Sequence, residues 1–180
     1  MFALTKRLTL RPGWAEDAPA LARAIGHEAV VRNLARAPWP YTLGDAEAFL
    51  ALPRAADEPR FLIAKRADAR LIGGIALLRE SDGVWELGYW LAPDAWGRGY
   101  ATEAGRAVLD IARDTMRLPC LRARHHVENP ASGRVLRKLG FVETGRGRTF
   151  SLARGREVAS VEMALDLSDV DTPNQPAMAA

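Results

Sequence analysis

The stretch WGRGYAT, residues 96–102, decides the fold of this chain. It places two glycines at alternate positions between a short apolar segment and a long amphipathic one. Glycines let the backbone turn sharply, and they remove the Cβ atoms that would keep a ligand from the backbone N–H groups. A helix that begins directly after such a turn adds N–H donors without partners and a partial positive charge. The stretch therefore predicts a strand, a tight turn and a helix that together bind a phosphorylated small molecule.

On both sides of this turn, hydrophobic periodicity predicts an α/β fold with a mixed sheet and flanking helices. Short apolar runs bounded by turn residues indicate strands, and apolar residues three or four positions apart indicate helices. The expected strands are residues 8–10, 61–64, 71–78, 84–91, 120–127, 141–142 and 158–167. The expected helices are two short ones within residues 17–31, one capped by Thr42 or Asp45, one over residues 101–116 and one that begins at Asn129-Pro130. The sheet is thus mostly antiparallel, with a β-α-β-α core at its centre.

The length and composition suit one globular domain. The 180 residues are 48% hydrophobic and 26% charged, and we expect a single domain over residues 1–167 and a disordered tail over residues 168–180. No apolar run reaches the roughly 20 residues that span a bilayer, and no apolar segment of a signal peptide follows Lys6 and Arg7. Because Cys120 is the only cysteine, no internal disulfide can form, and we expect a cytoplasmic protein.

The charge is distributed unevenly along the chain. The formal net charge is only +3, yet residues 95–156 contain 13 Lys or Arg and 5 Asp or Glu. Such a basic half could bind an anionic small molecule or a nucleic acid. The basic residues are scattered between apolar ones, without a lysine run or interleaved aromatic residues, and this pattern disfavours nucleic acid.

Two motifs in this sequence resemble those of the GNAT N-acetyltransferases. Residues 85–94 and 96–104 are similar to the acetyl-CoA motif of that family. Residues 129–132 and 138–141, which read NPAS and KLGF, are similar to the branch typified by the ribosomal-protein N-terminal acetyltransferases. The resemblance covers about residues 7 to 165. It implies the GNAT fold, acetyl-CoA as cosubstrate and no metal.

The resemblance also implies which residues hold the cosubstrate. In the family the CoA pyrophosphate lies on the backbone N–H groups of the glycine turn, which are here those of Trp96, Gly97, Arg98, Gly99, Tyr100, Ala101 and Thr102. The strand that ends at Leu91 and Ala92 would pair with the pantetheine arm, and an N–H near Trp90 or Leu91 would hold the acetyl carbonyl. Asn129 would bind the pantetheine amide, although a helix cap before Pro130 explains it equally well. A Rossmann dinucleotide site fits poorly, because the third glycine of its motif is replaced by Thr102.

The residues themselves and the resemblance each yield a candidate for catalysis. Glu86 is the candidate general base, because an attacking amine must lose a proton and a carboxylate can accept it through water. Strand alternation places Glu86 on one face with Gly88 and Trp90, and the alternative is an exposed glutamate paired with an arginine. Ser132 matches the position that would protonate the departing thiolate, and the alternative is a structural serine in a helix.

The remaining candidates are weaker. Trp39 and Tyr41 lie in a proline-rich segment, where they could line an acceptor groove with Trp90 or cover the core. His125 and His126 should lie on opposite strand faces, so at most one should face a cleft. Cys120 is expected to be a small core residue rather than a nucleophile. We find no His, Cys and Asp cluster with metal-ligand spacing.

These observations favour transfer of an acetyl group from acetyl-CoA to a primary amine, by direct attack in a ternary complex. The acceptor would be a protein N-terminus or a small-molecule amine, since a fold does not choose between them. The alternatives are an acyl-CoA sensor without turnover and, less favoured, a nucleic-acid-binding protein. A monomer and a homodimer are both compatible with the sequence, and no membrane partner is expected.

Overall fold

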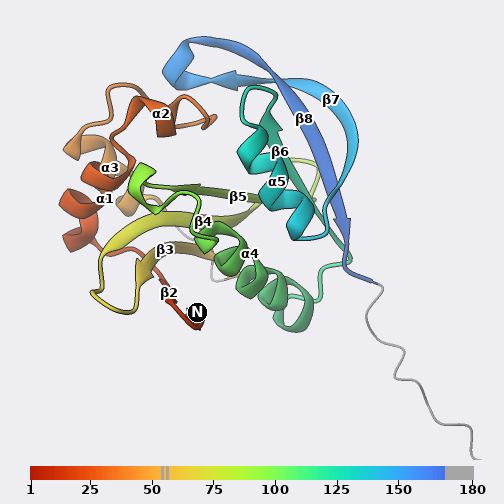
Figure 1. Ribbon diagram of the computed structural model, residues 1–180, viewed down its shortest axis with the longest axis horizontal. Coiled ribbons are helices and arrows are strands. Elements are labelled where there is room, and N and C mark those ends of the chain that lie inside the picture. Colours follow the sequence, from red (N-terminus) through yellow and green to blue (C-terminus); the bar gives the residue numbers. More distant parts are fainter. Residues whose placement is uncertain (54, 56, 169–180) are drawn as a thin grey trace, which may run out of the picture.

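A single sheet organises the structure, which is a computed structural model that describes residues 1–53, 55 and 57–168. Within these residues eight strands pair in the order β1-β2-β3-β4-β5-β6-β8-β7 (Figure 1). The strands are β1 (Ala3–Leu4), β2 (Leu8–Arg11), β3 (Arg60–Lys65), β4 (Leu71–Arg79), β5 (Trp85–Leu91), β6 (Cys120–His126), β7 (Val142–Ser151) and β8 (Arg156–Asp166). The helices are α1 (Ala18–Ile25), α2 (Glu28–Val31), α3 (Leu43–Ala51), α4 (Tyr100–Asp110) and α5 (Pro130–Lys138).

The sheet is antiparallel except where β5 meets β6. Strands β2 to β5 form the expected meander, and β6 to β8 form a second antiparallel group. Helix α4 connects β5 to β6, which are therefore parallel, and the two strands pair at Glu86 and Arg122. No further pair of described residues joins them, so β5 and β6 diverge toward Leu91 and His126.

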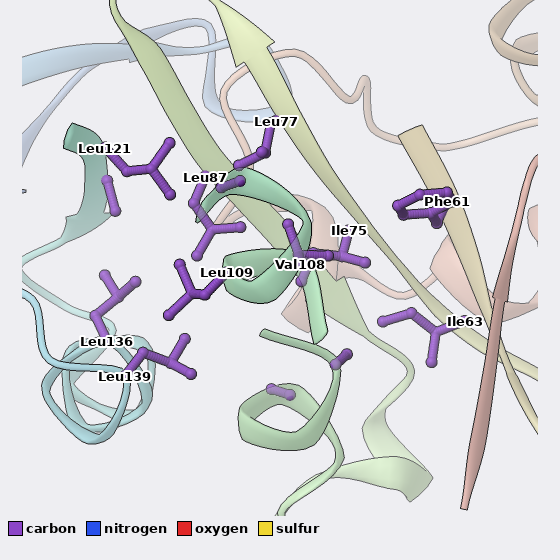
Figure 2. Close-up of a cluster of buried hydrophobic side chains, with 14 of the residues drawn as sticks. Phe61, Ile63, Ile75, Leu77, Leu87, Val108, Leu109, Leu121, Leu136 and Leu139 are labelled. Atoms are coloured by element: carbon purple, nitrogen blue, oxygen red, sulfur yellow. The ribbon is translucent and has the colours of Figure 1, made fainter. Parts of the chain in front are cut away.

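Two apolar cores cover the two faces of the sheet. Helices α4 and α5 bury the larger one, in which Val108, Leu109 and Leu136 pack against strand side chains such as Leu77 and Leu87 (Figure 2). Helices α1 to α3 bury the smaller core on the opposite face. Strand β3 shows the alternation directly, because Phe61 and Ile63 belong to the first core and Leu62 to the second.

Local capping agrees with the sequence at α3 and α5. Thr42 is the N-cap of α3, and its hydroxyl accepts a hydrogen bond from the Asp45 N–H while the Asp45 carboxylate accepts one from the Thr42 N–H. This is a reciprocal capping box, so both proposed capping residues take part. Asn129 caps α5 through a bond from the Ser132 N–H, and Gly140 follows that helix with a φ of +95°.

The structure departs from the sequence prediction at three elements. The α-helical part of the predicted helix 101–116 ends at Asp110, and a π-helical segment, Ile111–Thr115, continues it. Strand β1 was not predicted, and β7 is ten residues long although only residues 141–142 were expected as strand. Strand β7 is an edge strand with mostly exposed side chains. Its sequence therefore lacks the apolar alternation from which we predict strands. The expected disordered tail lies outside the described residues, apart from Ser168. No helix in the described part of the chain has the length and apolar character that crossing a membrane requires.

Candidate active site

The glycine turn begins helix α4 in the predicted way. Gly97 and Gly99 have φ angles of +72° and +78°, in the left-handed region that residues with a Cβ rarely adopt. Gly99 is the N-cap and, as a glycine, gives the first turn of the helix no side-chain capping bond. The first helical bond runs from the Glu103 N–H to the Gly99 carbonyl, at 3.0 Å. The N–H groups of residues 100–102 precede this bond and are available to an anion.

Arg7, in the segment before β2, holds this turn in place. Its Nη1 donates to the Arg98 carbonyl at 3.0 Å, and its Nε and backbone N–H donate to the Glu103 carboxylate at 2.6 and 2.8 Å. The guanidinium also lies 4.5 Å from the centre of the Tyr100 ring. Because a trans peptide directs its carbonyl and its N–H in opposite directions, Arg7 turns the Gly99 N–H away from itself. Sequence reasoning missed Arg7, which is more than 90 residues from its partners.

A cavity of about 1580 Å³ extends from this turn along β5 and past the ends of β5 and β6. A single small-molecule site usually measures roughly 300–1,000 Å³. The volume is therefore large enough for two ligands side by side. The predicted site residues that line the cavity are Tyr41, Glu86, Trp90, Leu91, Trp96, Gly97, Gly99, Tyr100, Ala101, Thr102, Asn129 and Ser132.

Backbone register determines which N–H groups of β5 face the gap toward β6. The Ala92 N–H donates to the Ile72 carbonyl at 2.8 Å, so these residues form a hydrogen-bonded pair. In an antiparallel ladder such pairs alternate with pairs whose N–H groups point away from the partner strand. Leu91, opposite Gly73, belongs to the second kind. Of the two expected carbonyl-binding positions, only Leu91 therefore directs its N–H away from β4, because Trp90 pairs with Gly74 in the hydrogen-bonded register.

Two predicted cosubstrate residues lie outside this cavity. Ala92 is buried in the core beneath α1, and its N–H is already bonded to β4. Arg98 is exposed, and its carbonyl is occupied by Arg7. Trp96 is also held locally, because its indole Nε1 donates to the Leu91 carbonyl at 2.8 Å. This bond fixes the turn to the end of β5.

Tyr89 reaches across the gap from β5 to α5. Its hydroxyl lies 2.7 Å from the Ser132 Oγ and donates to the Ser132 carbonyl at 3.1 Å. Burial raises the pKa of Tyr89 to about 12, so the hydroxyl stays protonated. Sequence reasoning missed this role, because alternation alone places Tyr89 in the core. Ser132 is thereby fixed at the cavity wall beside Asn129, whose side-chain oxygen accepts the Ser132 N–H at 3.2 Å.

Glu86 lies on the cavity wall and is paired with Arg124 of β6. Both guanidinium bonds, from Nε and Nη2, end on Oε2, and no described residue donates to Oε1. The Glu86 side chain is 17% exposed. Burial raises its pKa above the ordinary carboxyl value, although the bonds and charge of Arg124 oppose this rise. The arginine pairing that we considered as an alternative is present, and the carboxylate also borders the cavity.

Both histidines of β6 line the cavity, so the expectation that at most one would face it was wrong. The cavity passes the end of the strand and meets both of its faces. His125 packs under α5, where a Cβ on Gly133 would lie 2.7 Å from its Nε2. His126 is buried, and burial and the charge of Arg154 lower its pKa. Cys120 is exposed rather than in the core, because it begins β6 at the outer end of the strand.

The three aromatic candidates for the acceptor groove separate in the structure. Tyr41 and Trp90 line the main cavity, and burial raises the pKa of Tyr41 to about 12. Trp90 packs closely on β4, where a Cβ on Gly74 would approach its Nε1 to 2.7 Å. Trp39 is 43% exposed and lies at a separate hollow of about 220 Å³. The structure therefore does not bring Trp39 to the main cavity wall.

Comparison with known proteins identifies the family. Residues 7–142 match the acetyltransferase (GNAT) domain. An uncharacterized N-acetyltransferase, p20, of Bacillus licheniformis is 28% identical over 158 residues, which cover 84% of this chain and 88% of that protein.

Two solved structures share the fold. The ribosomal-protein-S5-alanine acetyltransferase of Vibrio fischeri is similar with a TM-score of 0.78, 17% identity and coverage of 96% of this chain and 100% of that one. The spermidine N-acetyltransferase of Vibrio cholerae, in complex with CoA and spermine, gives a TM-score of 0.76, 22% identity and coverage of 91% and 98%. In the described residues no group of three or more His, Cys, Asp or Glu could hold a metal ion. The chain belongs to the GNAT family and is an acetyl-CoA-dependent N-acetyltransferase.

Proposed function

We propose that this enzyme transfers the acetyl group of acetyl-CoA to a primary amine, by direct attack within a ternary complex. The observation that carries the proposal is a single cavity with an anion-binding turn at one end and the carboxylate of Glu86 on its wall. The gap between β5 and β6 lies between them. Two substrates can therefore meet without an acetylated enzyme, and Cys120, which is exposed at the start of β6, takes no part.

The cosubstrate would bind by its diphosphate to the glycine turn. The N–H groups of Gly99 and residues 100–102 would donate to phosphate oxygens, and bonds to an anion are roughly twice as strong as neutral ones. The pantetheine arm would run through the gap between β5 and β6, where the side-chain NH2 of Asn129 can reach its amide. Acetyl-CoA supplies an acetyl group activated as a thioester.

The Leu91 N–H would bind the acetyl carbonyl oxygen. It points away from β4, and Leu91 lines the cavity. As the amine adds to the carbonyl carbon, negative charge develops on this oxygen, and one placed donor contributes about 2.7–4 kcal/mol to such a step.

Proton transfer would use Glu86 and Ser132. Glu86 Oε1 would accept a proton from the attacking ammonium group, directly or through water, because only the free amine is a nucleophile. When the carbon–sulfur bond breaks, the Ser132 hydroxyl would protonate the leaving thiolate and recover a proton, through water, from the attacking nitrogen, which must lose its second proton to become the amide. Tyr89 would hold that hydroxyl in position. The amide product and CoA would then leave the cavity.

The alternatives make different predictions. A sensor would bind acetyl-CoA without releasing thiol, but it would not need Glu86 and Ser132 on one cavity wall. A nucleic-acid-binding protein would need an exposed basic surface. On β6 and β7, the side chains of Arg122, Arg124, Arg146 and Arg148 pair with Asp82, Glu86, Glu143 and Glu157, which lowers the net positive charge of that surface. Both observations favour the enzyme.

The direct test is release of free thiol from acetyl-CoA with a panel of peptides, amino acids and polyamines. We expect at least one amine to raise thiol release well above hydrolysis, and Glu86→Gln to lower kcat without loss of acetyl-CoA affinity. Binding of acetyl-CoA with no stimulation by any amine would favour the sensor. Unchanged turnover in Glu86→Gln would remove Glu86 as the base.

A further inference from the structure

A second hollow, of about 220 Å³, is lined by residues of α2, of the segment after it and of the connection between β7 and β8. Figure 1 shows this connection close to α2. Hydrogen bonds join these segments: the Leu152 N–H donates to the Ala35 carbonyl at 2.9 Å, and the Ser151 hydroxyl donates to the Leu34 carbonyl at 3.3 Å. The residues that line the hollow are Glu28, Arg32, Trp39, Ala153, Arg154 and Arg156. Arg32 and Arg154 also line the main cavity, so the two spaces adjoin.

Arg154 has an unused donor at this junction. Its Nε donates to the Arg32 carbonyl and its Nη1 to the Glu128 carboxylate, both at 3.0 Å. Its side chain is only 10% exposed, and Nη2 is buried without a partner among the described residues. A buried charged donor without a partner is costly, because its hydration is lost and nothing replaces it. A ligand with an anionic oxygen would remove this cost.

The charges around Arg154 leave an excess of positive charge in the hollow. Glu128 is shared between Arg154 and Arg32, at 3.0 and 3.4 Å, and is 58% exposed. Arg156 forms no ion pair with any described residue. His126 lies nearby, and burial and the Arg154 charge lower its pKa, so the ring adds no positive charge near neutral pH. Three guanidinium groups therefore face two carboxylates, those of Glu28 and Glu128.

This site is separate from the expected diphosphate site. The glycine turn lies at the start of α4, whereas Arg154 belongs to the connection between β7 and β8 (Figure 1). In the proposed complex the diphosphate of the cosubstrate occupies the turn. An anionic group at Arg154 is thus left for the other substrate, whose amine must reach the Glu86 side of the same cavity.

We infer that the amine acceptor carries a carboxylate or phosphate group, which binds Arg154 and Arg32 while its amine is acetylated. This inference rests on the proposed acetyl transfer and names its acceptor class. The exposed indole of Trp39 forms one wall of the hollow and can pack against the part of the acceptor that bears the anion. A polyamine such as spermidine has only positive charges and would be repelled here.

The test compares acceptors that differ in one charge. The peptides have a free N-terminal alanine and an amidated C-terminus, and they carry Asp, Asn or Lys at the second, third or fourth residue. A further pair of peptides carries phosphoserine or serine at these positions. Spermidine is the cationic acceptor. We expect kcat/KM to be about tenfold higher for the best anionic peptide than for its neutral match, as charged hydrogen bonds imply. The Asp and phosphoserine arms distinguish a carboxylate from a phosphate. Equal rates across charges, or a preference for spermidine or Lys, would overturn the inference.

Two variants assign the preference to this site. Arg154→Gln should abolish the preference for the anionic peptide while the KM for acetyl-CoA stays unchanged. Glu128→Gln should increase the preference, because it removes the carboxylate that competes for both arginines, and it does not disturb the bond from Arg154 to the Arg32 carbonyl. A preference that persists in Arg154→Gln, or that falls in Glu128→Gln, contradicts the inference.

Failure of the proposed function has a different signature. If no amine stimulates thiol release, acetyl transfer itself is wrong. Calorimetry with the N-acetylated Asp and Asn peptides then decides the anion site alone, and equal or absent heats for the two peptides would overturn it.

Discussion

Arg7 and Glu103, 96 positions apart in the sequence, are joined by two hydrogen bonds of 2.6 and 2.8 Å. Glu103 lies in the first turn of α4, close to the N–H groups that should receive a diphosphate. An unpaired carboxylate there would repel the ligand. Burial would raise the Glu103 pKa, but the bonds from Thr5 and Arg7 outweigh it and lower the pKa. The carboxylate is thus ionised but neutralised by Arg7, which also holds the Arg98 carbonyl.

Arg7→Gln should weaken binding of acetyl-CoA through the diphosphate. The variant leaves the Glu103 charge unbalanced and releases the Arg98 peptide, so the KM for acetyl-CoA should rise about tenfold, the loss expected for charged hydrogen bonds. With S-acetylpantetheine, which lacks the diphosphate, kcat/KM should stay close to that of the unaltered protein. Kinetics with the two thioesters measure the difference.

Lys65→Gln is the matched control for Arg7, because it removes a half-buried cation whose one ion pair among the described residues is with Asp68. This variant should leave kcat/KM unchanged with both acetyl-CoA and S-acetylpantetheine. The double variant with Arg7→Gln and Glu103→Gln should recover part of the acetyl-CoA affinity, because no unbalanced charge remains. An equal loss with both thioesters would mean that Arg7 supports the fold and not the diphosphate site.

Gly99→Ala should weaken acetyl-CoA binding by more than its loss of folding stability can account for. Gly99 and Gly155 both have positive φ, at +78° and +59°, and a Cβ at either position would meet no atom closer than 3.6 Å. Both alanine variants should therefore lose a similar stability, on the order of 1 kcal/mol. Only Gly99→Ala should weaken acetyl-CoA in calorimetry, because its methyl group stands at the turn. Equal affinities in the two variants would place the diphosphate elsewhere.

The sequence predicted what depends on local chemistry and missed what depends on distant contacts. The turn, its glycines and the caps of α3 and α5 are encoded by neighbouring residues, and all were found. The contacts of Arg7 with α4, of Tyr89 with Ser132 and of Arg154 with Arg32 join residues 43 to 122 positions apart. No periodicity or short motif records such pairs, because they arise only when the sheet forms.

The activity should fall at acidic pH as Glu86 becomes protonated. Burial raises the Glu86 pKa, so the acid limb of kcat should lie above the ordinary carboxyl range. Arg124 lowers this pKa, and Arg124→Gln should therefore move the acid limb to higher pH. Arg122→Gln, on the same strand face but bonded to Asp82, should leave the limb in place. A pH profile of kcat that is identical in all three proteins would exclude Glu86 as the titrating base.

Tyr89→Phe should slow the reaction only when the leaving thiol needs a proton. The variant removes the hydroxyl 2.7 Å from the Ser132 Oγ. Because Ser132 itself remains, kcat with acetyl-CoA should fall by about 10-fold, less than the roughly 10²–10⁴-fold that general acid catalysis contributes. An acetyl thioester of a more acidic thiol should be affected less. Ser132→Ala should show the same dependence on the thiol. An equal loss with both thioesters would assign the two hydroxyls to packing between β5 and α5.

Gly88→Leu should block the acceptor without disturbing the fold. Gly88 lies on the β5 face shared by Glu86 and Trp90, it lines the cavity, and a Cβ there would meet nothing within 4 Å. A leucine can therefore enter the cavity without strain, and the KM for the amine should rise by up to about 100-fold, the order of effect of displacing a substrate by roughly 1 Å. Gly74→Ala is the contrasting control, because its Cβ would lie 2.7 Å from the Trp90 indole nitrogen. That variant should lose about 1–3 kcal/mol in urea unfolding, as overpacking does. If Gly88→Leu raised the KM for acetyl-CoA and not for the amine, the cosubstrate would occupy this face, and Glu86 could not reach the acceptor.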